Sequence, residues 1–206
     1  MNLFSLIFLI ITKGDDMIAL PPPKFTNAPI EECILRRRSI RSFDNKELSL
    51  EQISALLWAA QGITDSLRGL RAVPSAGATY PLEIFIARGD GVYRYIPKGH
   101  KLKKEINRDL RKDIACAALN QMFIADAGVV IIITAVFNRT AWRYGDRAYR
   151  YINNEVGHCA QNIHLEAVAL GLGSVPVGAF DDEKLKKILK LGDEEPLYII
   201  PVGYKK

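Results

Sequence analysis

The densest group of side chains that could carry chemistry lies between residues 36 and 41. An arginine suits a phosphate because its planar guanidinium donates two hydrogen bonds at once and keeps its charge. If the preceding helix continues, two of the arginines share one face and a serine hydroxyl adds a donor. The same cations could instead stabilise the negative end of that helix, and the segment alone leaves both interpretations open. The group consists of Arg36, Arg37, Arg38, Ser39 and Arg41.

Two loops rich in small residues could bring the backbone close to a flat ligand. The first covers residues 74–81 and contains a single aromatic, Tyr80. The second covers residues 171–180 and follows a long helical pattern, where free backbone N–H groups can face a ring system. Taken alone, the first is better explained by an ordinary surface loop and the second by a helix end and its connection.

The cysteines and histidines form no pattern that binds a metal or makes disulfides. Three cysteines, at positions 33, 116 and 159, lie far apart without a C-x-x-C pair, and the three histidines match no ligand motif. We therefore expect no metal site, and the cysteine pattern favours a reducing, cytoplasmic location. A net charge of +5 is compatible with an anionic ligand. A nucleic-acid site is not expected, because no aromatic residues or basic repeats accompany the arginines.

The elements that must position these segments begin after an apolar run at residues 3–11. This run is shorter than the roughly 20 residues of a membrane span, which favours a packed arm over a membrane anchor. A start assigned too early, with Met17 as the true first residue, is the other interpretation. Pro21-Pro22-Pro23 then forms an extended spacer. We divide the chain into this arm over residues 1–20 and one domain over residues 21–206.

Several stretches of the domain have helical signals. Asn27 is expected to cap a helix that has Pro29 in its first turn. Ser49 and Gln52 form a capping box, and Gly62 ends that helix. Helical spacing is also expected over residues 101–127 and 147–172, and Asp181 begins a short helix.

Strand signals alternate with these helices. Residues 82–88 and 92–96 form a hairpin around Gly89-Asp90-Gly91, residues 129–137 form a strand buried on both faces, and residues 197–202 form the last strand. The order predicts an α+β fold. It lacks the βαβ alternation and the glycine motif of a dinucleotide-binding fold.

In this order and spacing, the arginine segment and the two loops resemble the nitroreductase superfamily over residues 21–204. Pro74-Ser75-Ala76-Gly77 and Ala169-Leu170-Gly171-Leu172-Gly173-Ser174 resemble most the branch of the SagB-type dehydrogenases. The resemblance implies a central, mainly antiparallel sheet wrapped by helices. It also implies an interlocked homodimer that binds FMN at the subunit interface, takes electrons from NAD(P)H and passes them to a small-molecule acceptor.

The resemblance further assigns cofactor contacts. Arg37, Arg38, Ser39 and Arg41 would contact the phosphate and the pyrimidine edge of the flavin. Pro74, Ser75, Ala76 and Gly77 would approach the flavin from the partner subunit. Val177, Gly178 and Ala179 would form the turn facing flavin N5, supported by Gly171, Leu172 and Gly173. FMN would carry the hydride chemistry, so no side-chain triad is required.

Two departures from the family bear on the activity. Many relatives continue beyond the last strand with basic residues for the phosphate, whereas this chain ends with Lys205 and Lys206. Azoline-oxidising members have a Lys-Tyr pair, and the matching positions here are Arg143 and Tyr144. Arginine keeps its proton at neutral pH, so a role in making peptide heterocycles is weakened, although Tyr144 could still act.

Three other functions stay open from the sequence. The chain could be a SagB-type dehydrogenase acting on a peptide or another substrate, a relative that breaks down FMN, or a flavin-binding protein without catalysis. A visible spectrum and an anaerobic titration with NADH would separate these classes. The sequence names neither the physiological acceptor nor the preferred nicotinamide.

Overall fold

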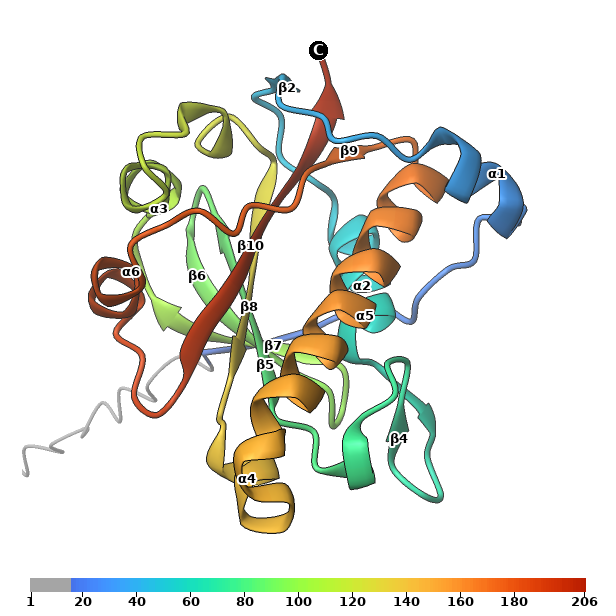
Figure 1. Cartoon of the computed structure of the whole chain (residues 1–206). Helices are drawn as coiled ribbons and strands as arrows, with labels where there is room; N and C mark the ends of the chain where they lie inside the picture. Colours follow the sequence, from blue (N-terminus) through green and yellow to red (C-terminus); the bar gives the residue numbers. More distant parts are fainter. Residues whose placement is uncertain (1–15) are drawn as a thin grey trace, which may run out of the picture.

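A computed structural model describes residues 16–206, and a single large sheet runs through its centre (Figure 1). Every pair of strands in this sheet is antiparallel. The α+β prediction is therefore confirmed. In spatial order the strands are β1 (Met17–Ala19), β7 (Lys101–Ile106), β6 (Gly91–Ile96), β5 (Leu82–Arg88), β8 (Val129–Ala135), β10 (Glu195–Lys205) and β2 (Phe43–Asp44), and β9 (Gly173–Ser174) also pairs with β10.

Strand β8 is the centre of the sheet, as its apolar, β-branched sequence predicts. All seven of its residues are buried, and it pairs with β5 on one side and β10 on the other. In register, Ile132 lies opposite Phe85 of β5 and Ile199 of β10. Side chains of a strand alternate between the faces, so β8 supplies apolar residues to the cores on both sides of the sheet.

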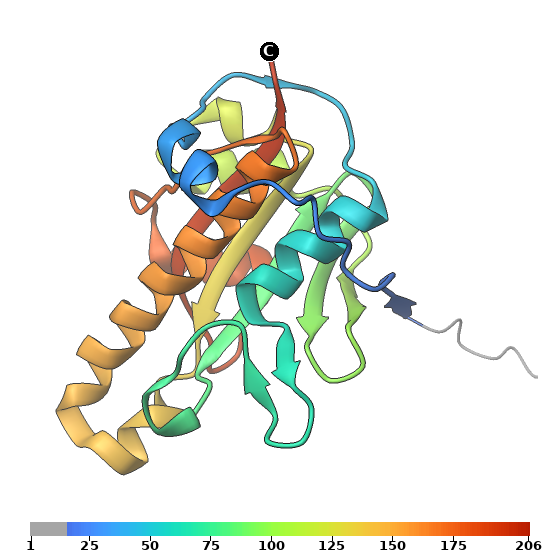
Figure 2. The ribbon, with the colours of Figure 1, turned by 90° about the vertical axis from the view of Figure 1, so that its right-hand side faces the viewer.

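Helices cover both faces of the sheet (Figures 1 and 2). On one face, α2 (Leu50–Gln61) and the 22-residue α5 (Ala148–Ala169) enclose a core that includes Leu56, Ile131 and Ile163. On the other face, α3 (Arg111–Ala117) and α6 (Asp182–Leu189) enclose a second core around Ile132 and Leu185.

The predicted signals at the ends of three helices are confirmed. Ser49 and Gln52 form both hydrogen bonds of the capping box of α2, and Gly62 follows its last residue. The Asp181 side chain accepts a hydrogen bond from the Lys184 N–H at the start of α6. Gly171, with φ of 74°, ends the turn after α5 in the left-handed region that favours glycine.

Two predictions of helical structure are wrong. Asn27 does not cap α1 (Ile30–Arg36), because the helix begins directly after Pro29 and has no side-chain cap. Residues 101–106 form strand β7, paired with β6 and β1. The sequence pattern suggested a helix from Lys101 onward, but a strand there satisfies the backbone of β6 and buries Leu102 completely. Helix α3 occupies the next part, followed by a 3₁₀ turn at Met122–Ile124.

The remaining elements lie at the ends of the sheet. Strands β3 (Ile63–Asp65) and β4 (Leu70–Arg71) form a separate hairpin. A 3₁₀ turn at Ala76–Ala78 lies in the predicted loop. Helix α4 (Asn138–Tyr144) and a 3₁₀ turn at Gly145–Arg147 lead into α5.

The predicted arm lies mostly outside the described residues, including its apolar run at 3–11. Its last part, β1, forms an edge strand of the sheet. No helix within residues 16–206 is long and apolar enough to cross a membrane.

Candidate functional site

The arginine segment after α1 is extended, so the helix does not continue to Arg41 and the condition for Arg37 and Arg41 to share a helical face is not met. The helix ends at Arg36, and Arg37 already has the extended ψ of 121°. The backbone then pairs with β9, where Ile40 N donates to Ser174 O at 3.0 Å and Ser39 forms a parallel bridge to Ser174. Because these β hydrogen bonds replace helical ones, side chains alternate along the segment.

This alternation still groups the predicted phosphate contacts. Arg37, Ser39 and Arg41 are spaced two residues apart, the spacing that puts side chains on one side of extended backbone. Arg38 points elsewhere, since its guanidinium donates to the carbonyls of Leu35 and Arg37 at 3.0 and 2.7 Å. Arg38 therefore acts as a cation at the C-terminal end of α1, which is one of the two interpretations of the arginine segment.

The last residues of β10 lie beside the same segment. Lys205 pairs with Phe43 of β2, and Lys206 N donates to Ser42 O at 3.3 Å. A Cβ atom on Gly173 would lie 2.9 Å from Lys205 Cγ and from Ile40 Cβ, so only glycine fits between the two segments. Within the described chain, none of Arg37, Arg41, Lys205 and Lys206 takes part in an ion pair. We call Arg37, Ser39, Arg41 and these two lysines the basic cluster.

A buried histidine adjoins the basic cluster. His164 of α5 is 4% exposed, and its Nδ1 lies 2.6 Å from Ser174 Oγ. Its Nε2 has no hydrogen-bond partner among the residues described. Burial and the nearby positive charge of Arg37 lower the pKa of His164 to about 4, so the ring is neutral at pH 7.

The second small-residue loop runs from the basic cluster along β10. Gly173 and Ser174 pair with β10, and Val177 exchanges backbone hydrogen bonds of 2.8 and 3.0 Å with Ile199. Gly178 and Ala179 then leave the sheet and are exposed. Within residues 16–206 no acceptor binds the N–H of either residue, so both donors are free.

A residue that the sequence interpretation missed lies next to this turn. Leu119 and Asn120 have φ values of 55° and 61°, a conformation that costs energy for residues other than glycine and is often found at functional sites. The following Gln121 donates from Nε2 to Ala179 O at 3.2 Å. Asn120, which is exposed, therefore lies close to the turn at Gly178. Asparagine adopts this conformation most readily, but the predicted helix over residues 101–127 concealed the signal.

The first small-residue loop contacts the predicted catalytic pair. Arg143 Nη1 donates to Gly77 O at 3.2 Å, and a Cβ on Gly77 would lie 2.5 Å from the Tyr144 hydroxyl. Gly77, Ala78 and Tyr80 all have positive φ. The structure thus brings Arg143 and Tyr144 together with the loop over residues 74–80.

The basic cluster and this loop lie at opposite ends of α5. His164 and Ser174 lie at its C-terminal end, whereas α4 and the first loop lie at its N-terminal end (Figure 1). A helix of 22 residues is about 33 Å long at 1.5 Å per residue. The two groups of predicted site residues therefore approach different parts of α5.

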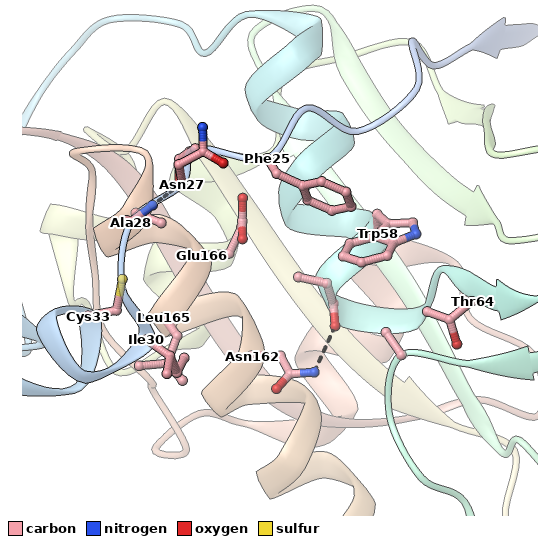
Figure 3. A pocket seen from close by; sticks show the side chains of 14 residues that line it. Phe25, Asn27, Ala28, Ile30, Cys33, Trp58, Thr64, Asn162, Leu165 and Glu166 are labelled. Carbon is pink, nitrogen blue, oxygen red and sulfur yellow. Dashed lines mark hydrogen bonds between the residues drawn. The ribbon is translucent and has the colours of Figure 1, made fainter.

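A separate pocket of about 470 Å³ lies between α1, α2 and α5 (Figure 3). Phe25 and Trp58 meet edge to face on one side, and Asn162 Nδ2 donates to Ala59 O at 3.0 Å. Glu166 lines the opposite side, and burial raises the pKa of its carboxyl. The pocket contains none of the predicted site residues.

Comparisons with known proteins point to one family. Residues 34–204 match the model of the Nitroreductase family. A Methanocaldococcus jannaschii protein whose name places it among the nitroreductases is 45% identical over 92% of this chain and 98% of its own. The trifolitoxin-processing protein TfxB of Rhizobium leguminosarum is 31% identical over 70% of this chain and 44% of its own. A crystal structure from Ralstonia eutropha, also named among the nitroreductases, superposes with a TM-score of 0.85 at 30% identity, covering 95% of this chain and 92% of that one.

Proposed function

Because the chain belongs to the nitroreductase family of oxidoreductases, we propose that it binds FMN and uses NAD(P)H to reduce small-molecule acceptors. Quinones and nitro compounds are the acceptors we expect. The reaction class follows from the family, and the assignment of FMN as cofactor rests on the basic cluster.

The basic cluster has the chemistry of a phosphate site. Cationic residues lie on adjacent exposed segments, and within the described chain no carboxylate forms an ion pair with them. The absence of a side chain on Gly173 lets the two segments approach closely. Arg37 and Arg41 would hold the phosphate of FMN, with Ser39 as an additional donor. Lys205 would add a further positive charge.

The turn at Gly178 would receive the flavin ring. It follows Ser174 by four residues, which in extended backbone is about 13 Å. The ribityl chain of FMN would lie along this stretch, with its ring at the free N–H groups of Gly178 and Ala179. Asn120 would lie at the edge of the same ring. When bound, FMN supplies the hydride chemistry, and these residues bind and orient it.

A second copy of the chain would complete the site. The loop over residues 74–77 lies toward the end of α5 that is opposite the basic cluster, and it would approach the flavin held by the partner. The exposed side of α5 suits such a contact because its middle carries small or uncharged residues (Asn153, Asn154, Gly157, His158 and Gln161). Large exposed apolar side chains flank both ends of α5, at Ile34 and Leu35 of α1 and at Trp142 of α4.

The purified protein should be yellow and bind about one FMN per chain. The measurement is absorption and fluorescence quenching during titration with FMN, followed by an anaerobic titration with NADH and NADPH. We expect the flavin absorption to bleach with a nicotinamide and to return when a quinone is added. Riboflavin, which lacks the phosphate, is the matched control and should bind at least ten-fold more weakly.

Three other outcomes of these titrations would each lead to a different conclusion. Failure to bind FMN when it is present in excess would refute the proposal. Bound FMN that neither nicotinamide reduces would instead indicate a flavin-binding protein without this activity. Loss of the flavin chromophore during turnover would indicate a relative that breaks down FMN.

A further inference from the structure

The pocket between α1, α2 and α5 is lined by one acidic side chain and by no lysine, arginine or histidine. The acidic residue is Glu166 of α5. In residues 16–206 its carboxyl forms no ion pair. Burial raises the pKa of this carboxyl, and no nearby cation opposes the shift. The pocket therefore contains a partly desolvated acid for which the described chain supplies no counter-ion.

Two aromatic rings form the wall opposite this carboxyl (Figure 3). Phe25 and Trp58 meet with their ring centroids 5.5 Å apart and their planes at 63°, so the rings form a corner. Gly62 fixes the place of the tryptophan, because a Cβ atom on Gly62 would collide with the Trp58 ring. In the described part of the chain no lysine or arginine stacks on either ring. Aromatic faces attract cations, and no cation of the chain occupies these two.

The rest of the lining is mostly apolar and includes Ile30, Leu165 and Ala169. Phe25 is 74% exposed and Ile30 is 53% exposed, and exposed apolar side chains that adjoin one cavity are typical of a ligand site. The volume of about 470 Å³ falls within the roughly 300–1,000 Å³ of small-molecule sites, which combine an apolar lining with a few polar groups. The pocket has the size and composition of such a site.

A cation with apolar substituents would satisfy these groups together. Its charge would pair with the Glu166 carboxylate and would be attracted by the aromatic faces, while its substituents would bury apolar surface. Asn162 has a free acceptor, because its Nδ2 already donates to Ala59 O. A neutral apolar ligand would leave the acid desolvated without a partner, and the carboxylate would repel an anion.

We propose that this pocket binds a small organic monocation, an ammonium group that carries aromatic or aliphatic substituents. Glu166 neutralises its charge, and Phe25 and Trp58 contact the ammonium and its substituents. Asn162 accepts a hydrogen bond from ligands that have an N–H. The site differs from the basic cluster, which attracts anions, and it does not require FMN.

The pocket lies outside the surface proposed above for contact with a second copy of the chain. None of the residues named for that contact on α1, α4 and α5 lines the pocket, and neither does any residue of the loop over 74–77. We therefore expect the pocket to stay accessible to a small ligand in the dimer.

Fluorescence of the full-length protein tests the proposal. The chain has two tryptophans, so Trp142→Phe leaves Trp58 as the only one that emits. Benzyltrimethylammonium is the probe. Its neutral isostere neopentylbenzene, in which carbon replaces the nitrogen, and the anion phenylacetate are the control ligands. The ammonium should change the Trp58 emission saturably, and both controls should bind at least about ten-fold more weakly.

Two variants made in this background separate the carboxylate from the rings. Glu166→Gln keeps the side-chain size and removes the charge, so binding of the ammonium should weaken about ten-fold or more while binding of neopentylbenzene should not weaken. Phe25→Leu removes one aromatic face and should weaken binding of the ammonium about three-fold or more. Glu183→Gln changes an exposed carboxylate of α6 outside the pocket, and it is the matched control that should bind as the parent does.

Several outcomes would overturn the proposal. One is absence of binding by the ammonium, and another is equal binding of the ammonium and its neutral isostere. Equal affinity of Glu166→Gln and its parent for the ammonium would do the same. Binding that disappears as the protein is concentrated and forms dimers would show that a second copy fills the pocket. None of these titrations contains FMN, so their results are independent of the tests of the proposed function.

Discussion

The Arg37→Ala and Arg41→Ala variants should each bind FMN at least ten-fold more weakly than the unmodified protein while remaining folded. Removing one partner of a charged hydrogen bond that is shielded from water costs on the order of 2–5 kcal/mol. A loss of about 1.4 kcal/mol already corresponds to ten-fold. Both residues are exposed or half-exposed, and neither carries a structural ion pair in residues 16–206, so truncation should spare the fold. Fluorescence titration with FMN gives the affinities.

Arg36→Ala is the matched control for these variants. Arg36 is the neighbouring arginine, but it lies in α1 and pairs with Glu32 at 2.5 Å. Such exposed pairs contribute little to stability, so this variant should fold and bind FMN normally. Equal affinities in the Arg36, Arg37 and Arg41 variants would show that the cluster serves the end of α1 and not a phosphate.

The second large effect concerns the substrate class. We expect reduction of quinones or nitroaromatics driven by NAD(P)H, and oxidation of peptide azolines at least about 100-fold more slowly. Forming an aromatic ring from an azoline requires removal of a proton from carbon, where a positioned base typically contributes 10²–10⁴-fold. By the resemblance, Arg143 matches the position where azoline-oxidising members have a lysine, and a guanidinium is not a base that can take such a proton. Its guanidinium binds Gly77 O in this structure.

The rates of acceptor reduction and of azoline oxidation should be measured with one preparation of the protein. Arg143→Lys is the matched variant. The lysine could lose its proton when desolvated, so azoline oxidation should rise in the variant if Tyr144 and the loop are otherwise competent. Rapid azoline oxidation by the unmodified protein would contradict the expectation and favour the alternative of a SagB-type dehydrogenase.

Local signals in the sequence predicted much of the fold correctly. The capping box at Ser49, the aspartate before α6 and the apolar run of β8 each specify their element through nearby residues alone. The three small or basic segments were also found. They were assigned to a flavin site because of their order along the chain, since each of them alone fits an ordinary loop or helix end.

The failures have a common physical cause, which is pairing between distant parts of the chain. Residues 101–106 become a strand because β6 and β1 lie beside them. Arg37–Arg41 is extended because β9, more than 130 residues later, offers hydrogen bonds that end the helix. The unusual backbone at Asn120 and the pocket between α1, α2 and α5 likewise depend on packing that periodicity does not reveal. Propensity is a weak guide wherever such tertiary contacts decide.

Two chains should build each FMN site. Mixed dimers test this most directly. One parent carries Arg37→Ala with Arg41→Ala, and the other carries Gly77→Leu, whose side chain would collide with Tyr144 and displace the loop. Each parent alone should bind little FMN. In a purified heterodimer, selected by two different affinity tags, one site would combine both defects and the other would combine the intact basic cluster with the intact loop.

If two chains build each site, this heterodimer should bind about one FMN per two chains, with near-normal affinity. A heterodimer that binds no more FMN than its parents would contradict a shared site, because a site contained within one chain cannot be restored by mixing.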